Sequence, residues 1–500
     1  MVLDPARLVD FYREKLGERS LIVVSNREPY QHIYDEGEIS WICPPSGLTV
    51  GLDPIMRATG GTWIAHGNGS ADRAVVDKES CVRVPPDRPA YRLKRVWLSK
   101  KLEANYYYGF ANAALWPLCH VAYVRPTFQH HCWDAYVEAN SLFADAVQEV
   151  AGDEPALVFI QDYHLALLPR MIKERCPRAT VVQFWHIPWP NSEVFRIFPW
   201  RQQLIHGMLG NDLLGFHIRY HCNNFVDTVM EVLEAKEDRE RSAVIYQDRA
   251  TFVRPFPISV DFDDIAQGSS HPTDDKSLLR LINNIKSRGQ TLGIGVDRLD
   301  YTKGIRERLE AIDKLFDCYP ELKGKFVYLQ IGVPTRAHLA EYKLLSEQIG
   351  EMVESINWKH QEEAWLPIVY RKSYHSPETL QWLYRQADLC LVTSLHDGMN
   401  LVAKEYVAAQ VESKGALILS AFTGAARELP QAFIVNPYAL DEVVNAIHQA
   451  LILPKEDLRR RMEALRETVR DHNVFHWARK IIDHVSRIEK HSFSPVTPLL

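Results

Sequence analysis

Short runs of apolar residues alternate along the chain with stretches in which apolar residues recur every three or four positions. The short runs have the length of buried strands, and the longer stretches have the period of amphipathic helices. Continuous apolar strands separated by helices are typical of parallel sheets that helices cover on both faces. The pattern therefore predicts an α/β fold built from doubly wound sheets. The expected strands are 21–24, 156–160, 180–185, 212–216, 292–296, 326–331, 389–392, 416–419 and 433–435.

The pattern also predicts two domains, because 500 residues are too many for one ordinary core. The best break is Arg254-Pro255-Phe256-Pro257-Ile258, where two prolines disfavour a helix. We therefore expect a Rossmann-like N-terminal domain over 1–257 and a Rossmann-like C-terminal domain over 258–476. A final amphipathic helix within 477–500 is expected to pack back onto the N-terminal domain.

Composition narrows the class of protein. The 46% hydrophobic and 24% charged fractions are those of a soluble globular protein, and no run approaches the ~18 apolar residues of a membrane span. A net charge of −6 argues against a nucleic-acid partner, which would need a broad basic excess. The eight scattered cysteines form no C-x-x-C pair, and the N-terminus has no apolar signal region, so a cytoplasmic protein is expected.

Motifs for metals and common cofactors are absent from the sequence. His130-His131-Cys132 has no second ligand pair at zinc spacing, so no metal site is expected there. Gly67-Asn68-Gly69 does not follow a convincing strand, and no G-x-x-x-x-G-K-[ST] occurs. A dehydrogenase and a P-loop NTPase are therefore both disfavoured, and no bound cofactor is expected.

The most informative segment is 395–406, which connects the expected strand 389–392 to an expected helix over 402–410. A small-residue turn before a helix presents backbone N–H groups at its N-terminus, which favours an anion. Asp397 and Glu405 add a carboxylate on each side of this turn. Amides for a phosphate and carboxylates for hydroxyls together indicate a sugar nucleotide.

Polar residues follow several expected strands, at the edge where open α/β sheets bind ligands. Arg27, Asp162 and His186 follow three strands of the N-terminal half. Arg298 and Lys303 follow strand 292–296, and a guanidinium fork beside an ammonium group suits a diphosphate. If the diphosphate leaves during the reaction, both cations stabilise the charge that develops on it.

With these segments assembled, the chain resembles the trehalose-6-phosphate synthases, which are retaining glycosyltransferases of the GT-B type. The motifs that carry the resemblance are Ser25-Asn26-Arg27, Ser46-Gly47-Leu48, Tyr107, Asn112-Ala113-Ala114-Leu115-Trp116-Pro117, Asp162-Tyr163-His164, His186-Ile187-Pro188, Arg298-Leu299-Asp300-Tyr301-Thr302-Lys303-Gly304, Arg336 and the run from Asp397 to Glu405. The resemblance implies two Rossmann-like doubly wound domains that face each other across a deep cleft.

The resemblance also implies a role for each matching residue. The acceptor sugar phosphate would be bound by Arg27, Tyr107, Trp116, Asp162 and Arg336. The donor would be bound by Gly47, Arg298, Lys303, Asp397, Gly398, Met399, Asn400, Leu401, Val402 and Glu405. Residues expected to act in the reaction are Arg298, Lys303, Asp162 and His186. In such enzymes the leaving phosphate accepts the proton of the attacking hydroxyl, so neither a carboxylate nucleophile nor a metal is implied.

Three residues depart from the family pattern. Ser46 replaces a glycine of the donor loop, His66 replaces a tryptophan, and His396 replaces an arginine before Asp397. The expected reaction is transfer of glucose from a nucleotide-glucose, UDP-glucose first, to glucose 6-phosphate. Transfer to glycerol 3-phosphate and a non-catalytic regulatory relative stay open as alternatives. Guanine or adenine as the donor base, and a homo-oligomer, also stay open.

Overall fold

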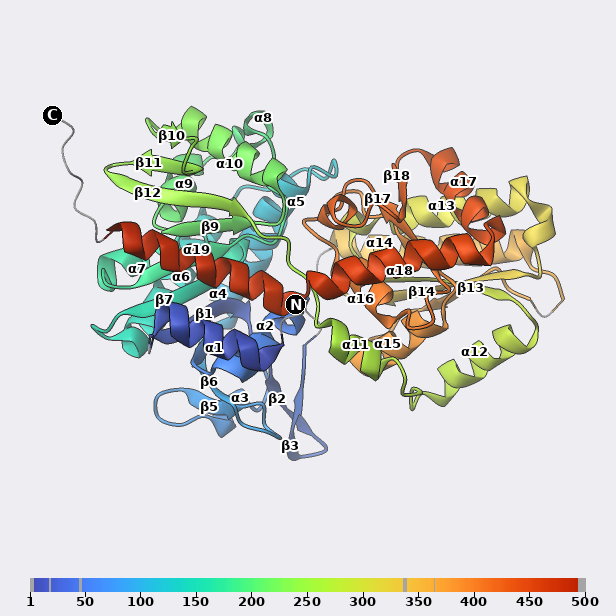
Figure 1. Cartoon of the computed structure of the whole chain (residues 1–500), viewed down its shortest axis with the longest axis horizontal. Helices are drawn as coiled ribbons and strands as arrows, with labels where there is room; N and C mark the ends of the chain where they lie inside the picture. Colours follow the sequence, from blue (N-terminus) through green and yellow to red (C-terminus); the bar gives the residue numbers. More distant parts are fainter. Residues whose placement is uncertain (1–3, 18, 45–46, 336–339, 364, 493–500) are drawn as a thin grey trace. The chain divides into compact units, whose positions relative to one another are not determined.

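The structure is a computed structural model that describes residues 4–17, 19–44, 47–335, 340–363 and 365–492 (Figure 1). It divides into two compact units. Unit 1 holds the residues up to 258 together with those from 474 onward, and unit 2 holds residues 259–473. The sequence placed the boundary after residue 257 and the return of the chain at residue 477.

Unit 1 is built on a ten-stranded sheet in the order β10-β11-β12-β9-β8-β7-β1-β4-β6-β5. The seven strands from β12 to β6 run parallel, and β5, β10 and β11 pair antiparallel at the two ends. The strands are β1 (Ser20–Arg27), β4 (Thr62–His66), β5 (Cys81–Val84), β6 (Tyr91–Val96), β7 (Ala156–Gln161), β8 (Thr180–Phe184), β9 (Leu213–Phe216), β10 (Lys236–Asp238), β11 (Ala243–Tyr246) and β12 (Arg249–Pro255). A separate hairpin pairs β2 (Gln31–Asp35) with β3 (Glu38–Ile42).

Helices connect the strands of unit 1. They are α1 (Pro5–Leu16), α2 (Gly47–Thr59), α3 (Asp72–Val75), α4 (Lys100–Glu103), the π-helix η1 (Ala104–Leu115), α5 (Trp116–His120), α6 (His130–Ala151), the 3₁₀ turn η2 (Tyr163–Leu165), α7 (Leu168–Arg175), α8 (Ser192–Phe195), α9 (Arg201–Met208), α10 (Arg219–Val232) and α19 (Val474–Ser492). The chain leaves β1 toward β4 and β6 and later returns to β7 on the other side. This reversal between β1 and β7 is a topological switch point, where open sheets form binding crevices.

Unit 2 is built on a six-stranded parallel sheet in the order β15-β14-β13-β16-β17-β18. The strands are β13 (Thr291–Arg298), β14 (Phe326–Val333), β15 (Ile368–Arg371), β16 (Leu389–Val392), β17 (Ala416–Ser420) and β18 (Phe433–Val435). The helices are α11 (Phe262–Gly268), α12 (Lys276–Ser287), η3 (Tyr301–Lys303), α13 (Ile305–Cys318), η4 (Pro320–Leu322), α14 (Ala340–His360), α15 (Pro377–Gln386), α16 (Leu401–Ala409), η5 (Gly424–Arg427), α17 (Leu440–Ile452) and α18 (Lys455–Asp471). Here the strand order reverses between β13 and β16.

All nine strands expected from the apolar runs are present, and eight of them are largely buried as parallel strands should be, whereas the edge strand β18 is only partly buried. One sequence inference was wrong. Gly67-Asn68-Gly69 does follow a strand, because β4 ends at His66. Only Trp63, Ile64 and Ala65 are apolar in β4, and this run is too short to stand out although all five residues of the strand are buried.

Helix α19 joins unit 1 through an apolar face. Trp477 is 2% exposed, and its Nε1 donates a hydrogen bond to the Phe256 carbonyl oxygen at 3.2 Å. Its ring lies 5.8 Å from the Phe159 ring and 5.2 Å from the Phe184 ring, centroid to centroid. The last described helix therefore completes a core whose other members lie far earlier in the chain. Among the described residues, no helix is long and apolar enough to cross a membrane.

Candidate functional site

In unit 2, Arg298 and Lys303 lie at the carboxyl end of β13. Arg298 is the last residue of that strand, and Lys303 ends the short turn η3 that follows it. Gly304 comes next with φ +62°, and a Cβ there would lie 2.1 Å from the Thr393 carbonyl oxygen. Only glycine allows this close approach, so it fixes the path of the chain directly after Lys303.

A second turn, 393–400, meets the first one. The Leu395 amide donates to the Thr302 carbonyl oxygen at 2.8 Å. Lys303 Nζ lies 2.5 Å from Asp397 Oδ2, and both side chains are largely buried. The structure therefore brings together two predicted site residues that are 94 positions apart.

Asn400 connects the Asp397 carboxylate to the start of α16. It adopts a positive φ of +75°, its Oδ1 accepts from the Ala403 amide at 3.1 Å, and its Nδ2 donates to Asp397 Oδ2 at 3.2 Å. Helix α16 begins at Leu401, so the backbone of 398–402, which includes Gly398, Met399, Leu401 and Val402, lies at a helix N-terminus. Such amides lack intrahelical partners and favour an anion.

Glu405 lies one turn further along α16. The Tyr384 hydroxyl donates to Glu405 Oε2 at 3.3 Å. Burial raises the pKa of the Glu405 carboxyl to about 7, and the Tyr384 hydrogen bond offsets only part of that effect. The carboxyl group is therefore poised to change charge near neutral pH.

Arg308 lies beneath both turns and was not found by sequence reasoning. Its buried guanidinium donates to Asp297 Oδ2 at 2.5 Å, to Thr393 Oγ1 at 2.9 Å and to the Lys303 carbonyl oxygen at 3.3 Å. It thereby ties β13, the 393–400 turn and the Lys303 turn together. In the sequence, Arg308 looks like another charged residue on the exposed face of an amphipathic helix. For this reason no sequence pattern indicated that it is buried.

In unit 1, Arg27 and Tyr107 also meet. Arg27 ends β1, Tyr107 lies in the π-helix η1, and Arg27 Nη2 donates to the Tyr107 hydroxyl at 2.9 Å. The Tyr107 ring stacks on His164 with centroids 5.4 Å apart. Asn112 supports this arrangement, since its Nδ2 donates to the Tyr107 carbonyl oxygen at 2.8 Å. π-Helical turns are rare and are frequently found at functional sites.

Asp162 and His186 lie just beyond the carboxyl ends of the neighbouring strands β7 and β8. Asp162 directly follows β7 with a positive φ of +69°, which a non-glycine residue adopts only under constraint. Its Oδ1 accepts from the His186 amide at 3.1 Å, while His186 Nε2 lies 2.9 Å from Gln161 Oε1. Burial lowers the pKa of His186 to about 3, so the imidazole is neutral at physiological pH.

The other predicted residues have varied surroundings. Trp116 begins α5 and is 5% exposed, with its ring against His120 and Tyr163. Gly47 is the first residue of α2. Ser46 and Arg336 lie outside the described residues. His66 is buried at the end of β4, where its Nδ1 lies 3.0 Å from the Val96 carbonyl oxygen.

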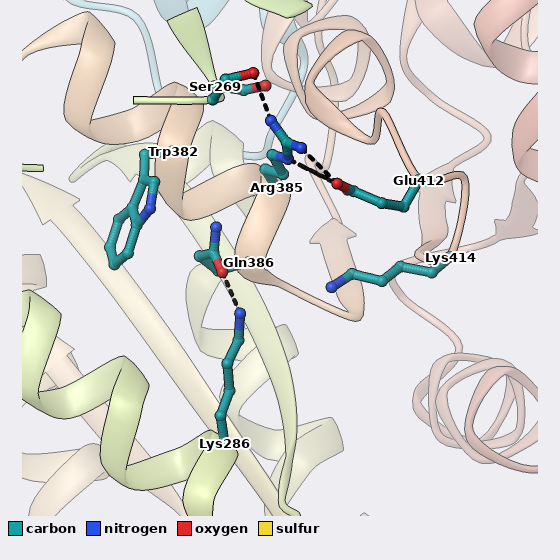
Figure 2. A pocket seen from close by; sticks show the side chains of 8 residues that line it. Ser269, Lys286, Trp382, Arg385, Gln386, Glu412 and Lys414 are labelled. Atoms are coloured by element: carbon teal, nitrogen blue, oxygen red, sulfur yellow. Dashed lines mark hydrogen bonds and ion pairs between the residues drawn. The ribbon is translucent and has the colours of Figure 1, made fainter. Parts of the chain in front are cut away.

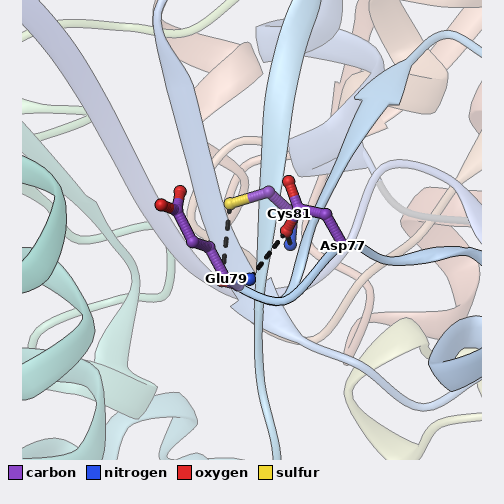
Figure 3. A group of neighbouring side chains, drawn as sticks. All are labelled: Asp77, Glu79 and Cys81. Carbon is purple, nitrogen blue, oxygen red and sulfur yellow. Dashed lines mark hydrogen bonds between the residues drawn. The ribbon is translucent and has the colours of Figure 1, made fainter.

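Two clusters in the described part of the chain hold side chains that metals prefer, and in both the groups already serve other partners. In the first, Asp77 Oδ1 accepts from the amides of Glu79 and Cys81 at 2.9 and 2.8 Å, which shapes a turn (Figure 3). In the second, Lys359 Nζ lies 2.9 Å from Asp313 and 2.6 Å from Asp317 beside His360. The ammonium group already pairs with both carboxylates.

A pocket of about 400 Å³ lies in unit 2, near the amino ends of the strands and thus away from Arg298 and Asp397 (Figure 2). Its lining includes Lys286, Gln386 and Lys414, which precede β13, β16 and β17 respectively. These positions are at the amino ends of the strands, whereas Arg298 and Asp397 lie at or beyond the carboxyl ends. Arg385 in its wall is paired with Glu412 at 2.5 Å. The pocket is therefore separate from the residues at the carboxyl edge.

Comparison with known proteins decides the family. Residues 19–487 match the sequence profile of Glycosyltransferase family 20. The chain belongs to glycosyltransferase family 20. A family member from Mycobacterium sp. (strain KMS), a trehalose-6-phosphate synthase, is 38% identical over 93% of this chain and 95% of its own.

Two further members of glycosyltransferase family 20 are informative. The UDP-forming α,α-trehalose-phosphate synthase A of Dictyostelium discoideum is 35% identical over 95% of this chain, which spans 64% of that longer protein. A crystal structure of the UDP-forming enzyme from Burkholderia xenovorans, in complex with glucose 6-phosphate, has a TM-score of 0.83 and 30% identity over 93% of this chain and 99% of its own. The two parallel-sheet units are thus the GT-B architecture of this family.

Proposed function

We propose that this family member is an α,α-trehalose-phosphate synthase that transfers glucose from UDP-glucose to glucose 6-phosphate. Relatives whose alignments cover over nine-tenths of this chain carry this activity in their names, one of them as UDP-forming. A structural relative is in complex with glucose 6-phosphate. The observation that carries the proposal is the carboxyl end of the unit 2 sheet, where Arg298 ends β13 and the Lys303–Asp397 pair lies just before the N-terminus of α16.

Unit 2 is assigned the donor. The diphosphate is held by Arg298, Lys303 and the amides at the start of α16, which suit a group carrying two negative charges. Asp397 accepts from hydroxyls of the glucose, and its hydrogen bond from Asn400 fixes its orientation. Glu405 accepts from the ribose hydroxyls.

Unit 1 is assigned the acceptor and part of the transferred glucose. Arg27 and Tyr107 bind the phosphate of the acceptor, since together they offer a charged donor and a hydroxyl. Trp116 provides an apolar surface for the sugar ring, and Gly47 approaches the donor phosphates. Asp162 and His186 contact hydroxyls of the glucose that is transferred. Arg336 is assigned to the acceptor phosphate by family resemblance alone.

The reaction follows from these assignments. The bond between the glucose anomeric carbon and the diphosphate oxygen breaks, and a bond forms from that carbon to the anomeric oxygen of glucose 6-phosphate. The acceptor's proton passes to the leaving diphosphate on the same face, which retains the configuration. The protein contributes position and electrostatic stabilisation of the growing negative charge.

The test is an activity panel. UDP-, GDP- and ADP-glucose are each combined with glucose 6-phosphate and with glycerol 3-phosphate, and release of nucleoside diphosphate is measured. UDP-glucose with glucose 6-phosphate should give the highest kcat/KM. A higher value with glycerol 3-phosphate, or no release with any pair, would overturn the proposal.

The compartment is part of the same proposal. We assign the protein to the cytoplasm, where thiols stay reduced. In support, Cys81, Cys119, Cys132, Cys176, Cys222 and Cys390 are all buried and unpaired as disulfides in the described chain.

A further inference from the structure

Gln161 is a buried polar residue for which the family resemblance supplies no role. It is the last residue of β7, it is 0% exposed, and its Oε1 lies 2.9 Å from His186 Nε2. Its amide nitrogen is also buried and has no hydrogen-bond partner among the described residues. A buried amide nitrogen without a partner opposes folding, so this glutamine carries a cost that packing alone does not explain.

The groups that face His186 come from three strand ends. From β7, Gln161 contacts the ring, and Asp162 accepts from the His186 backbone amide. From β8, Phe184 packs edge-on against the ring at 4.7 Å. After β9, His217 lies 5.5 Å from it, ring to ring, and its Nε2 contacts the His186 carbonyl oxygen rather than the ring. Within the described chain, Gln161 is therefore the side chain that makes a hydrogen bond to the His186 ring.

We propose that Gln161 is a positioning residue that holds His186 as a neutral imidazole protonated on Nε2. The Gln161 carbonyl oxygen accepts the Nε2 proton, which leaves Nδ1 with a lone pair. Nδ1 then accepts a hydrogen bond from a hydroxyl of the transferred glucose. This inference rests on the proposed function, which assigns His186 to that sugar.

The burial of His186 supports the same protonation state. A buried imidazolium here would lack a carboxylate partner on its ring, and burial lowers the His186 pKa to about 3. A glutamate at position 161 would keep the shape of the side chain but supply that carboxylate. The imidazole would then gain a second proton on Nδ1 and lose its acceptor.

The first test removes the side chain that makes the hydrogen bond to the His186 ring. Gln161→Leu should change the melting temperature little, because it removes the unsatisfied amide nitrogen but also leaves the buried His186 Nε2–H without its acceptor. Its kcat should fall by about tenfold, because one neutral hydrogen bond that holds the His186 ring is lost, with the KM for glucose 6-phosphate unchanged. Gln183→Leu is the matched control for a structural role.

Gln183 is also 0% exposed, but its amide is satisfied. It donates to the Asp162 carbonyl oxygen at 3.2 Å and accepts from Asn211 at 3.0 Å. Gln183→Leu should therefore lower the melting temperature. If Gln161→Leu lowers it equally and keeps the wild-type kcat, Gln161 is structural and the inference fails.

The second test adds the charge. Gln161→Glu should raise the His186 pKa, so that kcat falls as pH decreases through the new pKa and recovers at higher pH. The wild type should show no limb from His186 above pH about 5, because its pKa lies near 3. Superimposable pH profiles for the two proteins would overturn the inference.

A spectroscopic reading separates this inference from the proposed function. In ¹⁵N-histidine-labelled wild-type protein at pH 7, His186 should show a protonated Nε2 and an unprotonated Nδ1, with the signals assigned by their loss in His186→Asn. The opposite tautomer would contradict the inference even in an active enzyme. Conversely, the expected tautomer in a protein inactive on every substrate pair would leave the role of Gln161 on His186 standing while the proposed function failed.

Discussion

Glu405 carries a carboxyl group whose charge changes near neutral pH. Because burial raises its pKa to about 7, a large share of the ligand-free protein has this group protonated at neutral pH. A carboxylate accepts hydrogen bonds from both ribose hydroxyls better than a carboxylic acid does. We therefore expect UDP to bind more tightly as pH rises from 6 to 8, and to weaken by up to about tenfold per pH unit well below the pKa.

Isothermal titration calorimetry across this pH range provides the measurement. Glu405→Gln should bind UDP more weakly at pH 8, and its UDP affinity should not depend on pH.

The raised pKa of Glu405 also affects the stability of the fold. The contribution of Glu405 to stability is fully present below its unfolded pKa near 4.5 and is lost as pH rises through 7, a difference of about 3 kcal/mol that the glutamine variant should remove. Equal pH dependence in both proteins would contradict the role of this group.

Arg298 is the second residue-scale prediction. Negative charge on the diphosphate is greatest as the sugar bond breaks, so Arg298→Ala should lower kcat by about a hundredfold to a thousandfold and change UDP affinity far less. Steady-state kinetics and calorimetry measure the two effects separately. Arg280, exposed on α12, gives a matched arginine-to-alanine control that should keep wild-type values. Equal losses in turnover and affinity would remove Arg298 from a transition-state role.

The positions of the candidate residues at strand ends were predictable, but their partners were not, and their roles stay predictions. Arg27, Asp162, Arg298 and Asp397 could be selected because each follows an apolar strand. Their partners could not, since Arg27 and Tyr107 are 80 positions apart, and no local pattern indicates that a buried Arg308 binds the Lys303 carbonyl oxygen. Arg336 lies outside the described residues, and its role stays a prediction.

At the scale of elements, the turn after β13 depends on Gly304. Gly304→Ala would place a Cβ 2.1 Å from the Thr393 carbonyl oxygen, so the turn that carries Lys303 must shift. UDP affinity should fall by at least about tenfold if Lys303 binds the diphosphate as proposed, because the shift moves its ammonium group away from that ligand. Gly324→Ala is the control: its φ is also positive, at +76°, but nothing lies within 4 Å of the added Cβ. Comparable UDP affinities in the two variants would show that the close contact is not needed.

Elements followed the apolar pattern where that pattern was strong. Nine strands of the two sheets were predictable because short runs dominated by apolar residues are typical of strands covered on both faces. Strand β4 was missed because its apolar run is short. The π-helix η1 was not predictable either, since its geometry depends on tertiary partners such as the hydrogen bond from Tyr163 to Asn112 at 3.0 Å.

At the scale of the whole molecule, unit 1 depends on a helix from the far end of the chain. Trp477→Ala removes a buried ring that contacts Phe159 and Phe184, so the free energy of unfolding of unit 1 should fall by about 3–5 kcal/mol. Trp358, 81% exposed on α14 of unit 2, is the control and should give little change as alanine. Hydrogen exchange resolved by peptide distinguishes the units. A uniform loss of protection across both would mean that they unfold as one.

Unit 1 is built from two separate segments of the chain, and the sequence predicted this arrangement only in part. Two prolines indicate a break near residue 256, and the apolar face of the last helix indicates a partner. The partner itself is set by the aromatic cluster on β7 and β8, which sequence spacing does not reveal. Tertiary contacts across more than 200 residues decide it, as the hydrogen bond from Trp477 to Phe256 spans 221 positions.

Helix α19 has a consequence for synthesis on the ribosome. Unit 2 is translated in full, from residue 259 to 473, before the residues that close the core of unit 1 exist. The nascent chain must therefore hold an unfinished unit 1, with the apolar surface around Phe159 and Phe184 uncovered, while unit 2 folds beside it. Any truncation before residue 474 would make that transient state permanent, and such a protein should need a chaperone or aggregate.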